Sequence, residues 1–340
     1  CNFLKNLMIK NNKFLIKNLK NVVFIGYIDE IEKLILLNKS IKLKSYVITS
    51  KNYANKFKKN IKPKIYKSLR KSDYESYIKS KVNIENTLFI SLGSRWIFSK
   101  EKIKNFYQNN IINYHGARLP LDKGGGGFSW RIMLNDRIDC SLFHCIDEGI
   151  DSGKIVFFKT NLIPRELIVP KDYEKFKTQN FIKFYSDFIQ KLKNGNNFSL
   201  QDQPEYFGSY YPRLNTKING WIDWNMNSHD LLSFINAFDD PYEGAATYIN
   251  NQKVFLKQVQ LHGNEVSNHS FMSGIIRRIE KNFLVISTVD KNTLIVEKVL
   301  NKNKNNIISK LKIGDRFYTP SIKLDLAKST KIKYTSSSKG

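Results

Sequence analysis

Two polar side chains that can do chemistry, Asn113 and His115, come directly after the aliphatic pair Ile111-Ile112. Leu119-Pro120 follows them and ends any regular element. A histidine can take or relay a proton near neutral pH, and an Asn amide can donate a hydrogen bond to a developing oxyanion. The pattern indicates a catalytic site at the end of a buried strand, although the same side chains could merely cap that strand.

A second cluster with carboxylates lies in "HCIDEGIDSGKIV", residues 144–156. Its glycines predict a tight loop that carries Asp147, Glu148 and Asp151 before the next strand, and Asp151 could orient a histidine or simply serve the turn. His144 stands in an apolar run and is interpreted as a core or supporting residue. No Ser or Cys sits in a nucleophile elbow, and no metal-ligand spacing is found, so neither covalent acyl transfer nor a metal site is predicted.

The elements that must position these residues alternate between strand and helix. Short apolar runs at 21–29, 45–50, 86–93 and 110–115 predict strands, and residues 31–38 repeat apolar residues at helical spacing. Such alternation is typical of an α/β fold with a Rossmann-like, mostly parallel sheet. Ligands bind beyond the carboxyl ends of the strands in these sheets, where the loop at 91–98 and the loop of Asn113 and His115 are expected.

The second half of the chain changes character. Residues 181–192 predict an amphipathic helix, and residues 228–238 predict a second helix that begins at Ser228 as N-cap. An aromatic-rich loop lies at 203–216. From residue 271 onward, short β-rich runs separated by turn residues predict a small β-domain.

Composition restricts the partners and the compartment. The net charge of +26 invites a nucleic-acid interpretation, but only 10 of the 56 basic residues are Arg, the usual reader of bases and phosphates. Residues 1–110 hold 24 basic and 7 acidic residues, whereas residues 111–170 hold 7 of each, so the basic surface lies away from His115. Cys1, Cys140 and Cys145 form no disulfide framework, and the Lys-rich start has no apolar core for a signal peptide or membrane span. A cytoplasmic protein without membrane contact is expected.

Together these stretches resemble the folate-dependent formyltransferases of methionyl-tRNA, glycinamide ribonucleotide and sugar nucleotides. That family's pattern is Asn-x-His, then Leu-Pro, then an Asp in a Leu/Ile-Asp-x-Gly turn, which reads here Asn113-Tyr114-His115, Leu119-Pro120 and Ile150-Asp151-Ser152-Gly153. The combination is specific where each piece alone is weak. "IGDRFYTP" (313–320) resembles the end of the family's small OB-like domain. Lys123, in "LDKGGGGFSW", departs from the Arg-Gly of many members.

The resemblance implies formyl transfer from 10-formyltetrahydrofolate to a primary amine. It makes Asn113 the oxyanion donor, His115 the partner that steadies that charge or moves protons, and Asp151 the carboxylate that orients His115. The pterin would lie against the main chain of two loops, which match Trp96, Ile97 and Phe98 and then Ile146, Asp147 and Glu148.

Three identities of the acceptor stay open. A sugar-nucleotide N-formyltransferase is favoured because the loop 121–129 after Pro120 holds one Lys and one Asp, whereas tRNA enzymes carry a basic insertion there. A methionyl-tRNA formyltransferase is the runner-up, since residues 271–328 hold 12 basic and 5 acidic residues. A non-enzymatic RNA-binding protein is the third, and a homodimer is also open. The residues expected to bind a nucleotide-linked amino sugar are Arg118, Tyr206, Tyr210, Tyr211 and Arg213.

The predicted domain organisation follows from these segments. We expect an N-terminal extension at 1–20, a formyltransferase catalytic domain at 21–205, a connecting segment with a helix at 206–262, an OB-like domain at 271–328 and a flexible tail at 329–340.

Overall fold

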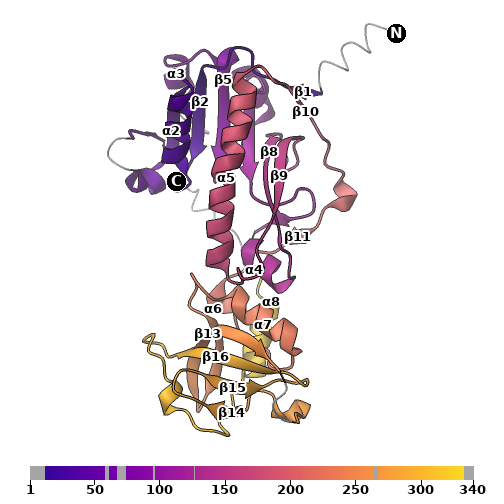
Figure 1. Ribbon diagram of the computed structural model, residues 1–340. Coiled ribbons are helices and arrows are strands. Elements are labelled where there is room, and N and C mark those ends of the chain that lie inside the picture. Colours follow the sequence, from indigo (N-terminus) through magenta and orange to yellow (C-terminus); the bar gives the residue numbers. More distant parts are fainter. Residues whose placement is uncertain are drawn as a thin grey trace.

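A computed structural model describes residues 12–57, 61–66, 74–94, 96–125, 127–263 and 267–332. Residues 1–11 of the predicted extension and residues 333–340 of the predicted tail lie outside this part. The two halves of the chain form two sheets, joined through the helices α4 (Gly127–Met133), α5 (Pro170–Lys193) and α7 (Ser228–Ala237) (Figure 1).

The first half builds a seven-stranded sheet in the order β4-β3-β2-β5-β6-β8-β9. The strands β4, β3, β2, β5 and β6 run parallel, and β8 and β9 add two antiparallel neighbours. This confirms the α/β fold with a mostly parallel sheet. The strand bounds are β2 (Asn21–Gly26), β3 (Lys44–Ser50), β4 (Lys64–Tyr66), β5 (Thr87–Leu92), β6 (Ile111–His115), β8 (Ile138–Cys145) and β9 (Ile155–Leu162).

Apolar layers cover both faces of this sheet. Every residue of β2 and of β5 is buried, which explains their near-continuous aliphatic runs. On one face pack α2 (Ile31–Ser40) and the long α5 (Pro170–Lys193). On the other face pack α3 (Tyr74–Lys79) and the π-helical segment η3 (Lys102–Phe106). In Figure 1, α5 runs along the sheet and continues toward the second domain.

The N-terminal extension predicted at 1–20 is a part of the first domain from residue 12 onward. Strand β1 (Lys13–Phe14) pairs with β10 (Phe198–Ser199), and Phe14, Ile16 and Leu19 are each at most 5% exposed in the core under α5. Lys13, Lys17 and Lys20, which alternate with these apolar residues, are exposed and made the buried face hard to recognise in the sequence.

Two helix boundaries differ from the prediction. Helix α5 begins at Pro170, eleven residues before the predicted start, and its earlier turns carry polar residues that weaken the apolar pattern. Helix α7 (Ser228–Ala237) is capped by Asn227, whose side chain accepts from the Asp230 N–H, so the prediction of Ser228 as N-cap is wrong. Ser228 instead donates its hydroxyl to Asp290 at 2.8 Å.

The second half forms a small antiparallel sheet in the order β12-β13-β16-β15-β14. Its bounds are β12 (Ala245–Ile249), β13 (Gln252–His262), β14 (Ile276–Ile279), β15 (Leu284–Ser287) and β16 (Thr293–Leu300). The predicted boundary at 271 is therefore too late. Residues 245–262 form two strands of this sheet. The sequence analysis assigned them to the connecting segment because they follow the predicted helix at 228–238.

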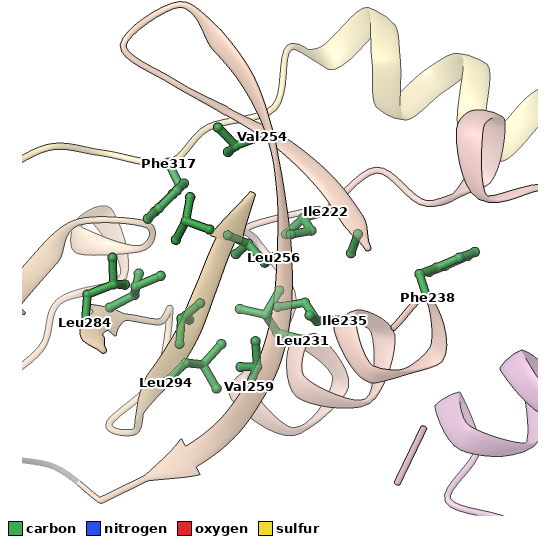
Figure 2. Close-up of a cluster of buried hydrophobic side chains, with 14 of the residues drawn as sticks. Ile222, Leu231, Ile235, Phe238, Val254, Leu256, Val259, Leu284, Leu294 and Phe317 are labelled. Carbon is green, nitrogen blue, oxygen red and sulfur yellow. The ribbon is translucent and has the colours of Figure 1, made fainter. Parts of the chain in front are cut away.

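This second sheet closes on itself. Tyr318 pairs with Tyr248 of β12, and Arg316 pairs with Ile275 beside β14, so the segment 314–318 joins the two edge strands. The result is a small barrel, as expected for an OB-like domain. Helix α7 packs its buried side chains Leu231 and Ile235 against this sheet (Figure 2).

The remaining short elements lie near the junction of the two domains. They are β7 (Lys123–Gly124), α4 (Gly127–Met133), β11 (Tyr210–Tyr211), α6 (Thr216–Asn219) and α8 (Ser321–Ser329). Among the described residues, no helix is long and apolar enough to cross a membrane.

Candidate active site

Strand β6 ends with Asn113 and His115, the two side chains that the sequence analysis singled out. Ile112 and Tyr114 face the core under α5, so the alternation of a strand sends Asn113 and His115 to the opposite face. Antiparallel pairing sets Asn113 opposite His144 of β8. Three polar side chains therefore gather where the parallel part of the sheet ends.

The turn after β8 brings a carboxylate to them. Asp151 adopts a left-handed conformation with φ of 55°, which bends the chain sharply after Ile150. Gly153 lies so close to β8 that an added Cβ would come within 1.9 Å of the Cys145 carbonyl oxygen. Asp147 accepts from the Ser152 hydroxyl at 2.7 Å and from the Gly149 N–H at 3.1 Å, which closes the loop.

The carboxylate of Asp151 lies between two histidines. Its Oδ2 is 3.6 Å from His115 Nδ1, and its Oδ1 is 3.5 Å from His144 Nε2. The Asn113 amide nitrogen lies 3.1 Å from His144 Nε2 and 3.5 Å from Asp151 Oδ1. The structure thus joins Asn113, His115 and Asp151, three residues that the sequence grouped, and adds His144 to them.

Burial and charge set the protonation of this cluster. Burial lowers the pKa of His115, and the neighbouring His144 and Lys177 lower it further, against the opposing effect of Asp151. For Asp151 burial would raise the pKa, but the hydrogen bond to His144 and the charges of His115, His144 and Lys123 outweigh it, so the pKa lies below its usual range. Near neutral pH the pair therefore consists of an imidazole that can accept a proton and an ionised carboxylate.

His144 has a fixed tautomer. Its Nδ1 lies 2.8 Å from the Cys145 carbonyl oxygen, which can only accept, so Nδ1 carries a hydrogen. Its Nε2 lies 3.1 Å from the Asn113 amide nitrogen and 3.5 Å from Asp151 Oδ1, so this nitrogen faces both side chains. His144 is 3% exposed, as expected for a core or supporting residue.

The thiols beside this cluster are unsuited to nucleophilic catalysis. Burial raises the pKa of Cys140 to about 12 and that of Cys145 to about 11. Both therefore stay protonated near neutral pH.

The two loops expected to hold a pterin lie together. Trp96 and Ile146 pack against the same apolar cluster under β5 and β6, and Lys100 lies 3.7 Å from Glu148. Phe98 is 5% exposed and packs on Tyr107, so only its main chain is available to a ligand, whereas Ile97 is 64% exposed.

The glycine loop after Pro120 and the aromatic loop at 203–216 also meet. Strand β11 pairs in parallel with β7, with Tyr210 opposite Lys123 and Tyr211 opposite Gly124. The Asp122 backbone and the Lys123 charge both act on the cluster around His115, so β11 pairs directly with a loop that borders His115 and Asp151. Residue 126 of the glycine run lies outside the described part of the chain.

The expected acceptor-binding residues differ in what they offer. Tyr206 and Tyr210 are 81% and 59% exposed, Tyr211 packs against Trp130 at 5.8 Å between ring centroids, and Arg213 is exposed. The Arg118 guanidinium contacts Asp122 at 3.1 Å and Asp136 at 2.6 Å and thereby holds the loop after β6; its binding of an acceptor stays a prediction.

Comparison with known proteins agrees with this architecture. Residues 215–311 match the family model described as the C-terminal domain of formyl transferases. The crystal structure of WlaRD, a sugar 3N-formyl transferase with dTDP and 5-N-formyl-THF, has a TM-score of 0.60 at 22% identity and covers 84% of this chain and 99% of its own. An N-formyltransferase from Helicobacter canadensis, in complex with folinic acid and dTDP-3-aminofucose, has a TM-score of 0.61 at 20% identity and covers 82% and 99%.

A curated sequence relative points the same way. The methionyl-tRNA formyltransferase of Blochmanniella pennsylvanica is 24% identical over 203 residues, which cover 59% of this chain and 60% of the enzyme. Residues 215–311 of this chain belong to the formyl transferase C-terminal domain family. The chain spans less than two thirds of that relative, and the two solved structures establish the fold.

Sequence reasoning missed or undervalued two residues near the cluster around His115, namely His144 and Lys177. Sequence reasoning interpreted His144 as a core or supporting residue and missed its contact with Asn113, because that contact follows from the register of β8 against β6. Lys177 stands on the buried stripe of α5, four residues before Phe181, and its ammonium reaches the backbone at Gly116, where an added Cβ would lie 2.0 Å from it. A lysine in an apolar stripe of a helix is the signal that could have found it.

Proposed function

We propose that this protein transfers a formyl group from 10-formyltetrahydrofolate to the primary amine of a nucleotide-linked amino sugar. The observation that carries the transfer is the Asp151 carboxylate within 3.6 Å of His115, beside the Asn113 amide, at the carboxyl end of β6. An amine acceptor must lose a proton as it attacks, and a buried neutral imidazole held by a carboxylate supplies the acceptor for that proton.

In this reaction His115, Asp151 and Asn113 each have a separate role. The amine nitrogen forms a bond to the formyl carbon, the bond from that carbon to N10 of the folate breaks, and a proton passes from the amine to the leaving nitrogen. His115 takes this proton, directly or through a water, and Asp151 stabilises the imidazolium that results. The Asn113 N–H that now lies 3.5 Å from Asp151 is weakly held, so it can turn to the developing oxyanion.

Two features favour a nucleotide-linked amino sugar as acceptor. The loop after Pro120 has no basic insertion, and it pairs with β11, which carries the exposed ring of Tyr210. One of the two solved structures contains dTDP and the other dTDP-3-aminofucose, each together with a folate. Surface polysaccharide biosynthesis is the expected use of such a product, and the cytoplasm its expected place.

The runner-up is a methionyl-tRNA formyltransferase, which the curated relative from Blochmanniella pennsylvanica favours. The test offers the purified protein 10-formyltetrahydrofolate with UDP-, GDP- and dTDP-linked amino sugars and, separately, charged initiator tRNA. Mass spectrometry then detects the formamide. We expect a product from an amino sugar. Formyl-Met-tRNA with no sugar product would reverse the choice of acceptor, and no product from any acceptor would argue for the third alternative, an RNA-binding protein on this fold.

A further inference from the structure

The C-terminal barrel carries an open pocket of about 440 Å³, lined by residues from two turns. One turn joins β12 to β13 and contributes Asn251, Gln252 and Lys253, with Tyr248 just before it. The other follows β16 and contributes Asn301, Lys302 and Asn303. These residues belong to the barrel and lie outside the cluster around His115. The volume is within the usual range for small-molecule sites.

The free hydrogen-bonding groups of this pocket are mainly donors. The Asn251 side-chain oxygen already accepts from the Tyr318 hydroxyl at 3.0 Å. The Asn301 side-chain oxygen accepts from the N–H groups of Asn303 and Asn305 at 2.9 and 3.0 Å. Each of these two amides therefore has its NH₂ group left for a ligand, and no carboxylate is among the lining residues.

Unneutralised positive charge gathers at the same place. Among the described residues, no carboxylate lies within ion-pair distance of Lys253, Lys302 or Lys323, and the one nearby acidic partner, Glu243, pairs with Lys217 at 3.7 Å. Burial lowers the pKa of Lys253, and the charges of Lys323, Lys302 and Lys217 lower it further. Like charges this close destabilise one another unless an anion is added.

Aromatic rings hold Lys253 in place. Its ammonium lies 4.4 Å from the ring centroid of Trp221 and 5.0 Å from that of Phe255. Trp221 stacks on Tyr248 at 5.5 Å and 11°, and Tyr248 stacks on Tyr318 at 5.9 Å. Tyr248 is itself one of the residues that line the pocket. The lysine is fixed by packing before any ligand arrives, which lowers the entropy cost of binding.

We propose that this pocket binds small molecules through a diphosphate group. The ammonium groups of Lys253 and Lys302 and the NH₂ groups of Asn251 and Asn301 match the several oxygens and the multiple negative charge of a diphosphate. The open side of the pocket leaves room for whatever the diphosphate is attached to. The proposal is independent of the reaction assigned to His115, because none of its residues belongs to the catalytic domain.

The experiment uses the full chain and inorganic pyrophosphate as probe. Isothermal titration measures affinity, and hydrogen–deuterium exchange locates the protected amides. We expect slower exchange at 248–253 and 301–306 and at least tenfold weaker binding in a Lys253→Met/Lys302→Met variant. Lys281→Met/Lys312→Met removes the same charge from exposed positions of the same domain and is expected to bind within twofold of the natural chain.

Parallel titrations identify the source of the group. UDP and ADP test nucleotides, inorganic phosphate tests whether one phosphate suffices, and a single-stranded RNA tests a polynucleotide surface. Lys253 packs on Trp221, so its replacement could disturb the fold. A Lys302→Met/Asn251→Ala variant leaves Lys253 in place and is expected to weaken binding of pyrophosphate as well. Equal loss in the control pair, protection outside the two turns, or binding of RNA without binding of pyrophosphate would each overturn the proposal.

Discussion

At the scale of single residues, the cluster at the end of β6 places a neutral imidazole, His115, beside an ionised carboxylate, Asp151. Burial would neutralise an isolated Asp151, yet the neighbouring histidines and Lys123 keep its pKa low. The same burial keeps His115 neutral despite that carboxylate. An ionised carboxylate beside a neutral imidazole is the resting state that a base for an amine requires.

We predict that His115→Ala and Asp151→Asn each lower kcat by roughly a hundredfold or more, the scale of losing one positioned acid-base or oxyanion group. Steady-state kinetics with 10-formyltetrahydrofolate measure the effect, and circular dichroism checks the fold. His229→Ala removes an exposed histidine on α7 and should leave kcat unchanged. Near-normal rates in both site variants would remove the pair from the mechanism.

The pH dependence follows from the lowered pKa of His115. The unfolded chain binds a proton at this histidine near pH 6.5, and the folded chain only at lower pH. Stability is therefore lost as pH falls below about 6.5, and kcat/KM falls on the same side. We expect His115→Gln to lose less unfolding free energy than the natural chain between pH 7 and pH 5.5, by urea denaturation. Asp151 acts in a separate window, because its lowered pKa stabilises the fold until pH drops below about 4.

At the scale of elements, the turn after β8 is as important as the residues it carries. Asp151 reaches His115 because Gly153 lets the chain press against the Cys145 carbonyl. We predict that Gly153→Ala costs about 1–3 kcal/mol of stability, the usual range for overpacking, and lowers kcat by moving Asp151. Gly127→Ala, where an added Cβ meets nothing within 4 Å, is the matched control. Thermal melting measures the stability of both variants, and steady-state kinetics measure their kcat. Equal stability and equal kcat in the two variants would contradict the prediction.

The pairing of β11 with β7 leads to a prediction about the acceptor. A base stacking on an exposed ring is worth about 1–3 kcal/mol, which corresponds to roughly fivefold to more than a hundredfold in affinity. Replacing both Tyr210 and Tyr211 by Ala should raise the KM of the acceptor by this factor and leave the KM of the folate nearly constant. Tyr242→Ala, at a ring 39% exposed on the surface near β12, serves as control. An equal rise of both KM values would point to a general loss of structure.

The elements show what sequence can and cannot predict. The buried runs of β2, β5 and β6 are visible because both faces are apolar, and their carboxyl ends locate Asn113 and His115. The contact of His144 with Asn113 depends on the register of two strands that run in opposite directions, which composition does not encode. Arg118 pairs with Asp136, which lies eighteen residues later in the sequence. No local sequence pattern predicts such a pair, so the sequence could not show that Arg118 is held by a carboxylate.

At the scale of the whole molecule, the net charge of +26 is unevenly distributed along the sequence, with an excess of +17 in residues 1–110. We predict that the +17 excess of residues 1–110 is mainly solvated lysine, so tRNA and duplex binding should be weak and fade steeply as salt rises. Filter binding across 50 to 200 mM salt is the measurement. Sub-micromolar affinity for tRNA near physiological salt would contradict this and would strengthen the tRNA runner-up.

The closure of the barrel has a consequence for where the chain can be cut. The matched family region ends at residue 311, yet the pairing that joins the two outermost strands comes from 314–318. A fragment that stopped at 311 would leave β12 and β14 as bare edges, each with a row of unpaired amide groups that can recruit another copy. The segment 314–318 thus protects both edge strands. A fragment that keeps this segment should stay monomeric, whereas the shorter fragment should associate through its exposed strand edges.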